Sequence, residues 1–189
     1  LDLGGATQRT FTTINPLDEI RGLDYRDGTG TLLISTNERL SGVIPSRVRE
    51  IHLDGTDVAG GIDLIVADFE PEATFYHDDR GTFFVADEEG PPGSEVGRVQ
   101  EVALDGTPGD GTNGVFFTVF ADPAYDDPNG MDYLGDYVYV GDDNSGGLLS
   151  RLEVFDLNGV SVFDEEWSTL TDATHSSAAT VAICQAVTT

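Results

Sequence analysis

One acidic stretch in the C-terminal half carries the spacing of a calcium loop. Asp142 and Asn144 stand at the first and third places of a loop of EF-hand type, and Glu153 stands at the twelfth. Side-chain oxygens at these places are the hard ligands that Ca²⁺ prefers. However, Gly146 at the fifth place offers no side-chain ligand, and the flanking residues are typical of strands instead of helices. A solvated hairpin turn is therefore the alternative interpretation.

Two other pairs of carboxylates are candidates for acid–base catalysis or for weak cation binding. Glu70 and Glu72 alternate along an expected strand, so they would share one face and could act as an acid and a base. One metal ligand beside one solvated charge is the simpler interpretation of that pair. Asp78 and Asp79 crowd two negative charges into one turn, which favours shared, weak cation binding or a plain salt-adapted surface.

Several kinds of chemistry have no motif in this sequence. It contains no Gly-Lys-Ser/Thr phosphate loop and no Gly-x-Ser-x-Gly elbow, so nucleotide hydrolysis and serine-hydrolase chemistry have no support. The histidines His52, His77 and His175 share no metal spacing, and we expect them at the surface or in packing. Cys184 is the single cysteine, and its apolar neighbours indicate a buried thiol.

The balance of charged residues excludes some classes of partner and indicates the habitat of the source organism. All nine basic residues are Arg, against 35 acidic residues, which gives a formal charge of −26. Such a field repels nucleic acid and anionic lipid, and no apolar window is long enough to insert into a membrane. An acidic surface without lysine is typical of proteins from salt-loving organisms, because salt screens the repulsion. An acidic calcium-binding extracellular protein is the alternative. We expect an extracellular or cell-envelope location, or the cytoplasm of a high-salt organism.

The strongest signal is an internal repeat with a period of about 50 residues. A strand that ends in a tight turn occurs at residues 50–56 (EIHLDGT), 101–107 (EVALDGT) and, in related form, 154–159 (VFDLNG). A second mark precedes it in the same register at residues 21–25 (RGLDY), 72–76 (EATFY) and 129–133 (NGMDY). Because two independent marks keep one register, we interpret them as a true repeat.

Each repeat unit is expected to form four short strands. In the second unit these lie near residues 72–76, 82–86, 98–104 and 115–120. Alternating β-branched and aromatic residues, bounded by Asp-Gly and Asn-Gly turns, are strand and hairpin signals. Four strands in about 50 residues are the signature of a β-propeller blade, and a β-sandwich is the alternative. We therefore predict an all-β fold in which residues 1–189 form one β-propeller domain or a fragment of one.

The repeat also sets the expected blade boundaries. Three full blades cover approximately residues 16–68, 69–121 and 122–168, and residues 169–189 with residues 1–15 form a partial fourth blade. Residues 178–187 carry the pattern of a strand of that fourth unit. The sequence begins at Leu1 with no signal segment, so we expect the natural N-terminus to lie upstream. A compact four-bladed ring and a part of a larger ring both remain open.

The third unit, with NGMDY at residues 129–133 and YVYVGD at residues 137–142, resembles a superfamily of β-propellers. This superfamily holds senescence-marker-protein lactonases, gluconolactonases and NHL-type repeats. The likeness covers about 150 residues as a repeat pattern. The lactonase branch has six blades, so the resemblance implies a fragment, an abbreviated ring or a different family.

The resemblance further implies a divalent cation, usually calcium, on the ring axis. Its ligands in that branch are Glu, Asn and Asp side chains at the starts of the innermost strands. The matching positions in this sequence are Arg21, Glu72 and Asn129. Glu72 and Asn129 offer oxygen ligands, whereas Arg21 would repel the ion. If no metal is bound, Arg21 is expected to pair with Glu72 across the axis.

Two classes of function follow. The first is a non-catalytic extracellular or envelope module that binds a protein or a glycan, with calcium as the cation that would steady its loops. The alternative is a calcium-dependent hydrolase of the lactonase or phosphotriesterase kind, acting on a small lactone or ester. In that enzyme the calcium on Glu72 and Asn129 would polarise a carbonyl or phosphoryl oxygen. Arg21 at the axial position favours the first class.

Overall fold

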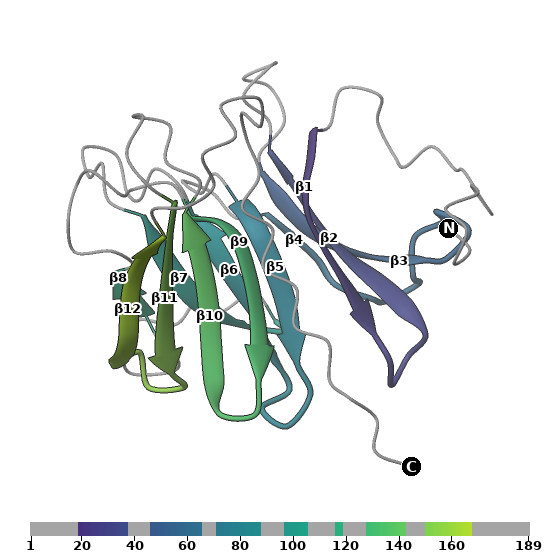
Figure 1. Ribbon diagram of the computed structural model, residues 1–189. Helices are drawn as coiled ribbons and strands as arrows, with labels where there is room; N and C mark the ends of the chain where they lie inside the picture. The colour runs from purple at the N-terminus through teal and green to yellow at the C-terminus, as the bar shows by residue number, and fades with distance from the viewer. Residues whose placement is uncertain are drawn as a thin grey trace, which may run out of the picture.

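The computed structural model describes residues 19–37, 46–65, 71–87, 97–105, 116–118, 128–142 and 150–167. Within these ranges the elements are twelve β-strands in three antiparallel sheets of four strands, each following chain order (Figure 1). Sheet 1 contains β1 (Glu19–Arg26), β2 (Thr31–Asn37), β3 (Arg47–His52) and β4 (Asp63–Ile65). Sheet 2 contains β5 (Pro71–His77), β6 (Thr82–Asp87), β7 (Arg98–Ala103) and β8 (Phe116–Thr118). Sheet 3 contains β9 (Pro128–Leu134), β10 (Tyr137–Asp142), β11 (Ser150–Asp156) and β12 (Ser161–Trp167).

These strands confirm the strand predictions that fall on described residues. Each of the four strands expected in the second unit is present, and the RGLDY, EATFY and NGMDY marks lie in β1, β5 and β9. The turns behave as expected as well, because Gly55 and Gly159 adopt φ values of 88° and 79°, which favour glycine. The predicted strand at residues 178–187 lies outside the described residues, as does the contribution of residues 1–15.

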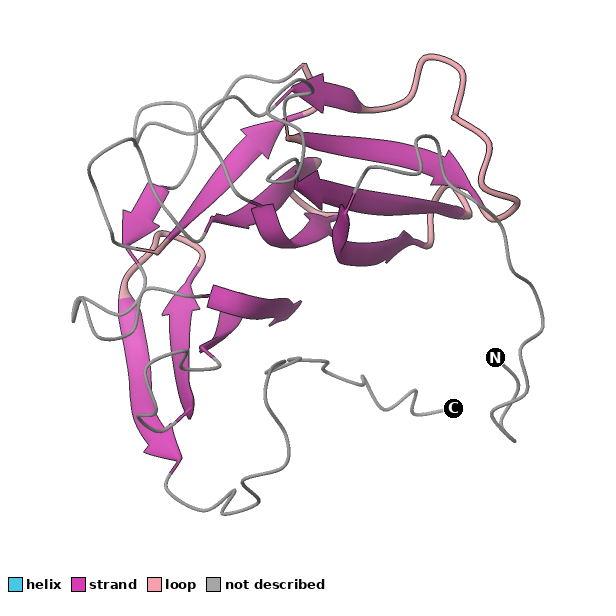
Figure 2. Ribbon diagram, turned by 90° about the horizontal axis from the view of Figure 1, so that it is seen from above, coloured by secondary structure: helices cyan, strands magenta, loops and turns pink. Residues whose placement is uncertain are grey.

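The first strands of the three sheets are neighbours. Strand β5 packs against β1 on one side and against β9 on the other, and β2 and β6 contribute to the same interfaces. The sheets are inclined to one another instead of stacking flat (Figure 2). Successive four-stranded sheets that meet through their first strands are the arrangement of propeller blades.

The cores lie between successive sheets. The core between sheets 1 and 2 consists of Leu33, Val48, Ile62, Phe83, Val85 and Val102, all buried. The core between sheets 2 and 3 contains Phe75, Phe84 and Phe155, and Phe75 stacks on Phe84 with ring centroids 4.9 Å apart. Side chains alternate across each strand, so a sheet buries one face on the preceding sheet and one on the following sheet. The described part of the chain contains no helix that could cross a membrane.

Candidate functional site

The close contact between β1 and β5 is set by a glycine. The backbone N–H of Gly22 donates to Ser35 Oγ at 2.8 Å. A Cβ atom built on Gly22 would lie 2.8 Å from the backbone nitrogen of Thr74 and 3.0 Å from the carbonyl carbon of Ala73. Real Cβ atoms do not approach other backbone atoms so closely. The absence of a side chain at Gly22 therefore lets β1 lie directly against the β5 backbone.

This approach brings Arg21 onto Glu72. Arg21 Nη1 donates to Glu72 Oε2 at 3.0 Å, and the Glu72 side chain is 3% exposed whereas that of Arg21 is 27% exposed. Charge-assisted hydrogen bonds are stronger than neutral ones, and a carboxylate this buried needs a charged partner. The predicted contact between Arg21 and Glu72 is thus present as an ion pair. It joins equivalent positions of two successive repeat units.

Asn129 occupies the third equivalent position. It is half-buried near the start of β9, the strand that packs against β5 on the side away from β1. The three positions that the sequence singled out therefore lie near the starts of three neighbouring first strands. The structure joins Arg21 to Glu72 directly, and a metal-ligand role for Glu72 and Asn129 stays a prediction.

The expected calcium loop is divided between two strands. Asp142 ends β10, Glu153 is a buried residue inside β11, and Asn144 lies outside the described residues. In the β10–β11 ladder Asp142 is opposite Arg151, and Glu153 is opposite Val140. Across the ranges that the structure describes, no group of three or more His, Cys, Asp or Glu side chains is arranged to hold a metal ion. Calcium binding by this loop also stays a prediction.

A second group of polar residues, missed in the sequence, lies further along the first strands. Asp24 accepts hydrogen bonds from the backbone N–H of Tyr76 at 2.7 Å and of Tyr25 at 2.8 Å. Burial raises the pKa of Asp24, and the negative charges of Asp132 and Asp78 raise it further against these hydrogen bonds. The signal was the Asp that recurs in RGLDY and NGMDY. The first strands therefore carry carboxylates further along their length as well as near their starts.

A stack of three rings lies beside these carboxylates. Tyr133 stacks on the buried ring of His77 with centroids 4.6 Å apart, and on Phe75 at 5.0 Å. Burial raises the pKa of Tyr133, and the charge of Asp78 adds to the effect. The phenol is therefore neutral at physiological pH. This end of the inner strands combines ring stacking with negative charge.

Buried glutamates on the third strands form a recurring clamp that the sequence did not reveal. Glu50 accepts from Thr31 Oγ1 at 2.6 Å and pairs with Arg26 Nη1 at 2.7 Å. Burial by itself would raise the pKa of Glu50, but the hydrogen bond from Thr31 and the charge of Arg26 outweigh it and lower the pKa. The signal was the Glu that opens both EIHLDGT and EVALDGT.

The second copy of this clamp is centred on Glu101. Arg80 donates to both carboxylate oxygens of Glu101 at 2.7 Å, and Thr82 Oγ1 donates at 2.5 Å. Bidentate pairs of this kind fix geometry as well as charge. The clamps tie the hairpin of the first and second strands to the third strand in sheets 1 and 2. We assign them a structural role.

Comparison with known proteins identifies solved structures with a similar fold. No family model matches the chain, and no curated protein matches it. The crystal structure of a nidogen/laminin complex is similar with a TM-score of 0.54 and 18% sequence identity, over 80% of this chain and 48% of that chain. A hydrazine synthase of Kuenenia stuttgartiensis is similar with a TM-score of 0.53 and 13% identity, over 79% of this chain and 37% of that chain. KlHsv2 with loop 6CD replaced by a Gly-Ser linker is similar with a TM-score of 0.50 and 14% identity, over 80% of this chain and 42% of that chain.

These similarities indicate the class of fold. The similar structures are β-propeller-like, and this chain has an all-β fold of the same kind, built from three antiparallel sheets. The chain spans less than half the length of the solved structures described above. At these identities the likeness concerns the fold, and activity has to be argued from the residues.

Proposed function

We propose that this chain is a non-catalytic β-propeller binding module of a salt-adapted protein, located outside the cell or in its envelope. The observation that carries the proposal is the ion pair between Arg21 and Glu72. A guanidinium group 3.0 Å from the carboxylate supplies the positive charge that an axial cation would otherwise supply. A Ca²⁺ ion at Glu72 would also be repelled by Arg21, so a metal-dependent hydrolase fits this axis poorly.

The distribution of charge indicates the kind of ligand. Among the residues that the structure describes, these arginines pair with carboxylates of the chain itself: Arg21, Arg26, Arg47, Arg49, Arg80 and Arg98. Ion pairs within the chain neutralise the positive charges of these arginines. The excess of carboxylates therefore dominates the electrostatic potential at the surface that a partner approaches. We propose a protein ligand with a basic surface, or a neutral glycan. The similarity to a nidogen/laminin complex, itself an assembly of proteins, supports this kind of role.

Calorimetry with a parallel turnover assay tests the proposal. Ca²⁺ is titrated at constant ionic strength into the wild type and into Glu72→Gln, and both are assayed with a lactone and a phosphotriester. We expect the same calcium response from both proteins and no turnover. Stoichiometric Ca²⁺ binding that disappears in Glu72→Gln, together with turnover by the wild type, would establish the calcium-dependent hydrolase instead.

Glu101→Gln is the matched control for that experiment. Glu101 is as buried as Glu72 and also pairs with an arginine, but it belongs to a clamp on the third strand. A calcium response lost equally in both variants would report a general loss of fold. A response kept in both would come from acidic turns, which leaves the proposed binding role intact.

A further inference from the structure

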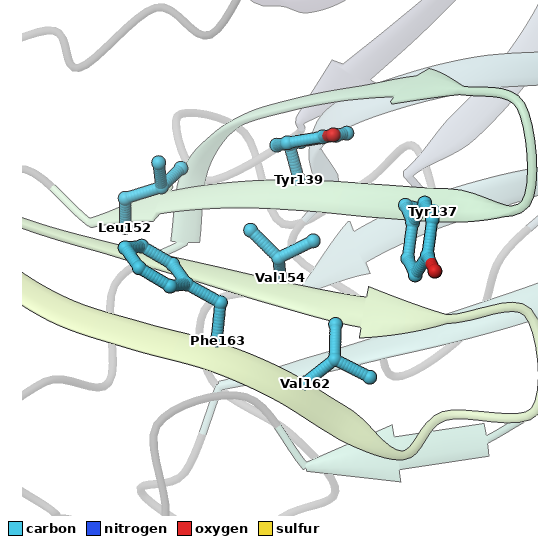
Figure 3. A pocket seen from close by; sticks show the side chains of 6 residues that line it. All are labelled: Tyr137, Tyr139, Leu152, Val154, Val162 and Phe163. Atoms are coloured by element: carbon cyan, nitrogen blue, oxygen red, sulfur yellow. The ribbon is translucent and has the colours of Figure 1, made fainter.

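The outward face of sheet 3 carries an open apolar hollow of about 420 Å³ (Figure 3). It is lined by Tyr137, Tyr139, Leu152, Val154, Val162 and Phe163, from β10, β11 and β12. Tyr137 is 45% exposed, Val162 52% and Phe163 44%. Apolar side chains gathered in this way mark an interaction surface, because leaving them in water costs free energy.

The repeat identifies this face as an interface between sheets. Tyr139 occupies the position of Leu33 in β2 and Phe84 in β6, as the strand ladders show. Leu33 and Phe84 are fully buried, because the first strand of the next sheet packs over β2 and over β6. Extending the same relationship by one unit places a further first strand over β10.

The chemistry of this face differs from that of its two counterparts. The positions of Thr31 and Glu50 in the first clamp are occupied in sheet 3 by Tyr137 and Val154. The charged clamp is thus replaced by an aromatic and an aliphatic side chain. At Val154 a charged group of a partner would not find the buried carboxylate that Glu50 supplies in sheet 1, so an uncharged segment fits this place better.

One segment of this chain has that chemistry. Residues 178–187 (AATVAICQAV) contain no charged residue, although the chain has a formal charge of −26. They follow β12 along the chain, as β5 follows β4 and β9 follows β8. We propose that residues 178–187, which lie outside the described residues, cover the apolar face of sheet 3 as the first strand of a further blade. The proposal is independent of the ligand and of the axial ion pair.

Cross-linking tests the contact directly, because Cys184 is the only cysteine of the chain. Val162→Cys adds a second thiol on the apolar face, and Leu104→Cys adds one at an exposed turn of sheet 2. Both full-length variants are treated with a short bis-maleimide at low protein concentration. We expect a cross-link within the chain for Val162→Cys and little for Leu104→Cys, seen as a mobility shift and as linked peptides by mass spectrometry. Equal cross-linking in both variants, no link within the chain, or links only between chains overturns the proposal, the last in favour of a second copy.

A charge substitution gives an independent measurement. Phe163 and Leu104 are both 44% exposed, so Asp at either position should be tolerated equally if both lie at the free surface. If residues 178–187 cover the face, Phe163→Asp buries a charge and should lower Tm by about 5–10 °C, against less than about 2 °C for Leu104→Asp. Equal shifts in the two variants, or a shift for Phe163→Asp that depends on protein concentration, contradict the proposal.

Discussion

Arg21 Nη1 lies 3.0 Å from Glu72 Oε2, and the two residues hold the same position in successive repeat units. A residue of one unit therefore meets its own counterpart in the next. The hydrogen bond from the Tyr76 backbone N–H to Asp24 also joins β5 to β1. The first strands of sheets 1 and 2 are joined by polar contacts as well as by apolar packing.

Removing the arginine of the ion pair between Arg21 and Glu72 should destabilise the fold. Arg21→Met leaves Glu72 buried without this partner, and we expect a loss of about 1–3 kcal/mol, because Arg21 itself is partly hydrated. Urea denaturation at constant salt measures the loss. Arg47→Met is the control, since Arg47 pairs with the exposed Asp63 and should lose under about 1 kcal/mol. Equal losses would mean that burial of Glu72 adds nothing to the strength of its pair.

A methyl group at Gly22 should separate β1 from β5. Gly22→Ala places a carbon against the Ser35 hydroxyl and the Thr74 backbone, and we expect a loss of about 1–3 kcal/mol. Gly28→Ala is the control, because a Cβ atom at Gly28 meets nothing within 4 Å. Thermal unfolding compares the two. A fully stable Gly22→Ala variant would show that the two strands can move apart without cost.

The Glu50 clamp predicts a dependence on pH. The folded protein lowers the pKa of Glu50 below its usual value of 4.5, so the carboxylate stabilises the fold above that pH. This contribution is lost as the pH falls through the lowered pKa of the folded state. Glu50→Gln should therefore cost about 2–3 kcal/mol at pH 7 and less below about pH 4.

Asp57→Asn is the control for the clamp. Asp57 pairs with Arg49 but is 61% exposed, so its loss should cost under about 0.5 kcal/mol at either pH. Denaturation curves at pH 7 and pH 3.5 for the two variants decide the matter. If the loss of stability in Glu50→Gln does not change with pH, the packing of the Glu50 side chain, and not its charge, stabilises the clamp.

Asp24 should titrate above its usual range. Burial is the main cause of its raised pKa, and repulsion from Asp132 and Asp78 adds to it. The ionised carboxylate therefore costs stability above its folded-state pKa, and this cost is relieved as the pH falls. Carboxyl chemical shifts followed against pH should place its midpoint above 3.8. Asp78→Asn should lower that midpoint only in part, and a midpoint below 3.8 would show that the hydrogen bonds outweigh burial.

Salt should stabilise the whole fold. With 35 acidic and 9 basic residues, the chain repels itself in dilute buffer, and molar salt screens that repulsion. We expect Tm to rise between about 0.1 M and 2 M NaCl. An unchanged Tm would contradict the salt-adapted interpretation. Millimolar Ca²⁺ that raises Tm far beyond NaCl of equal ionic strength would indicate specific calcium sites instead.

Local patterns allowed much of the fold to be predicted from the sequence. The strands of the second unit followed from alternation and from turns such as Asp54-Gly55, whose signals lie within a few neighbouring residues. The pairing of Arg21 with Glu72 was also predictable, because the repeat alone identifies them as equivalent. In a repeat protein, residues one period apart are expected to lie in neighbouring units, so such a contact can be predicted although the residues are distant in sequence.

The rest depended on packing between sheets, which no local pattern records. Glu50 stands in an alternating run that gives no sign of Arg26, which meets it from the end of β1. Asp24 was missed because its partner is the backbone of Tyr76, and a backbone donor leaves no trace in residue type. Contacts of this kind appear only when successive sheets are placed against each other.

The turns between the first and second strands suggest a use of the chain as a scaffold. Gly30 and Gly81 adopt positive φ values of 67° and 66° directly before β2 and β6, and Gly135 adopts a φ of 61° in the shorter turn before β10. A peptide grafted at any of these turns would leave from the hairpin between a first and a second strand, without entering either core. Three different epitopes could then be displayed side by side along one rim, at intervals fixed by the spacing of the sheets.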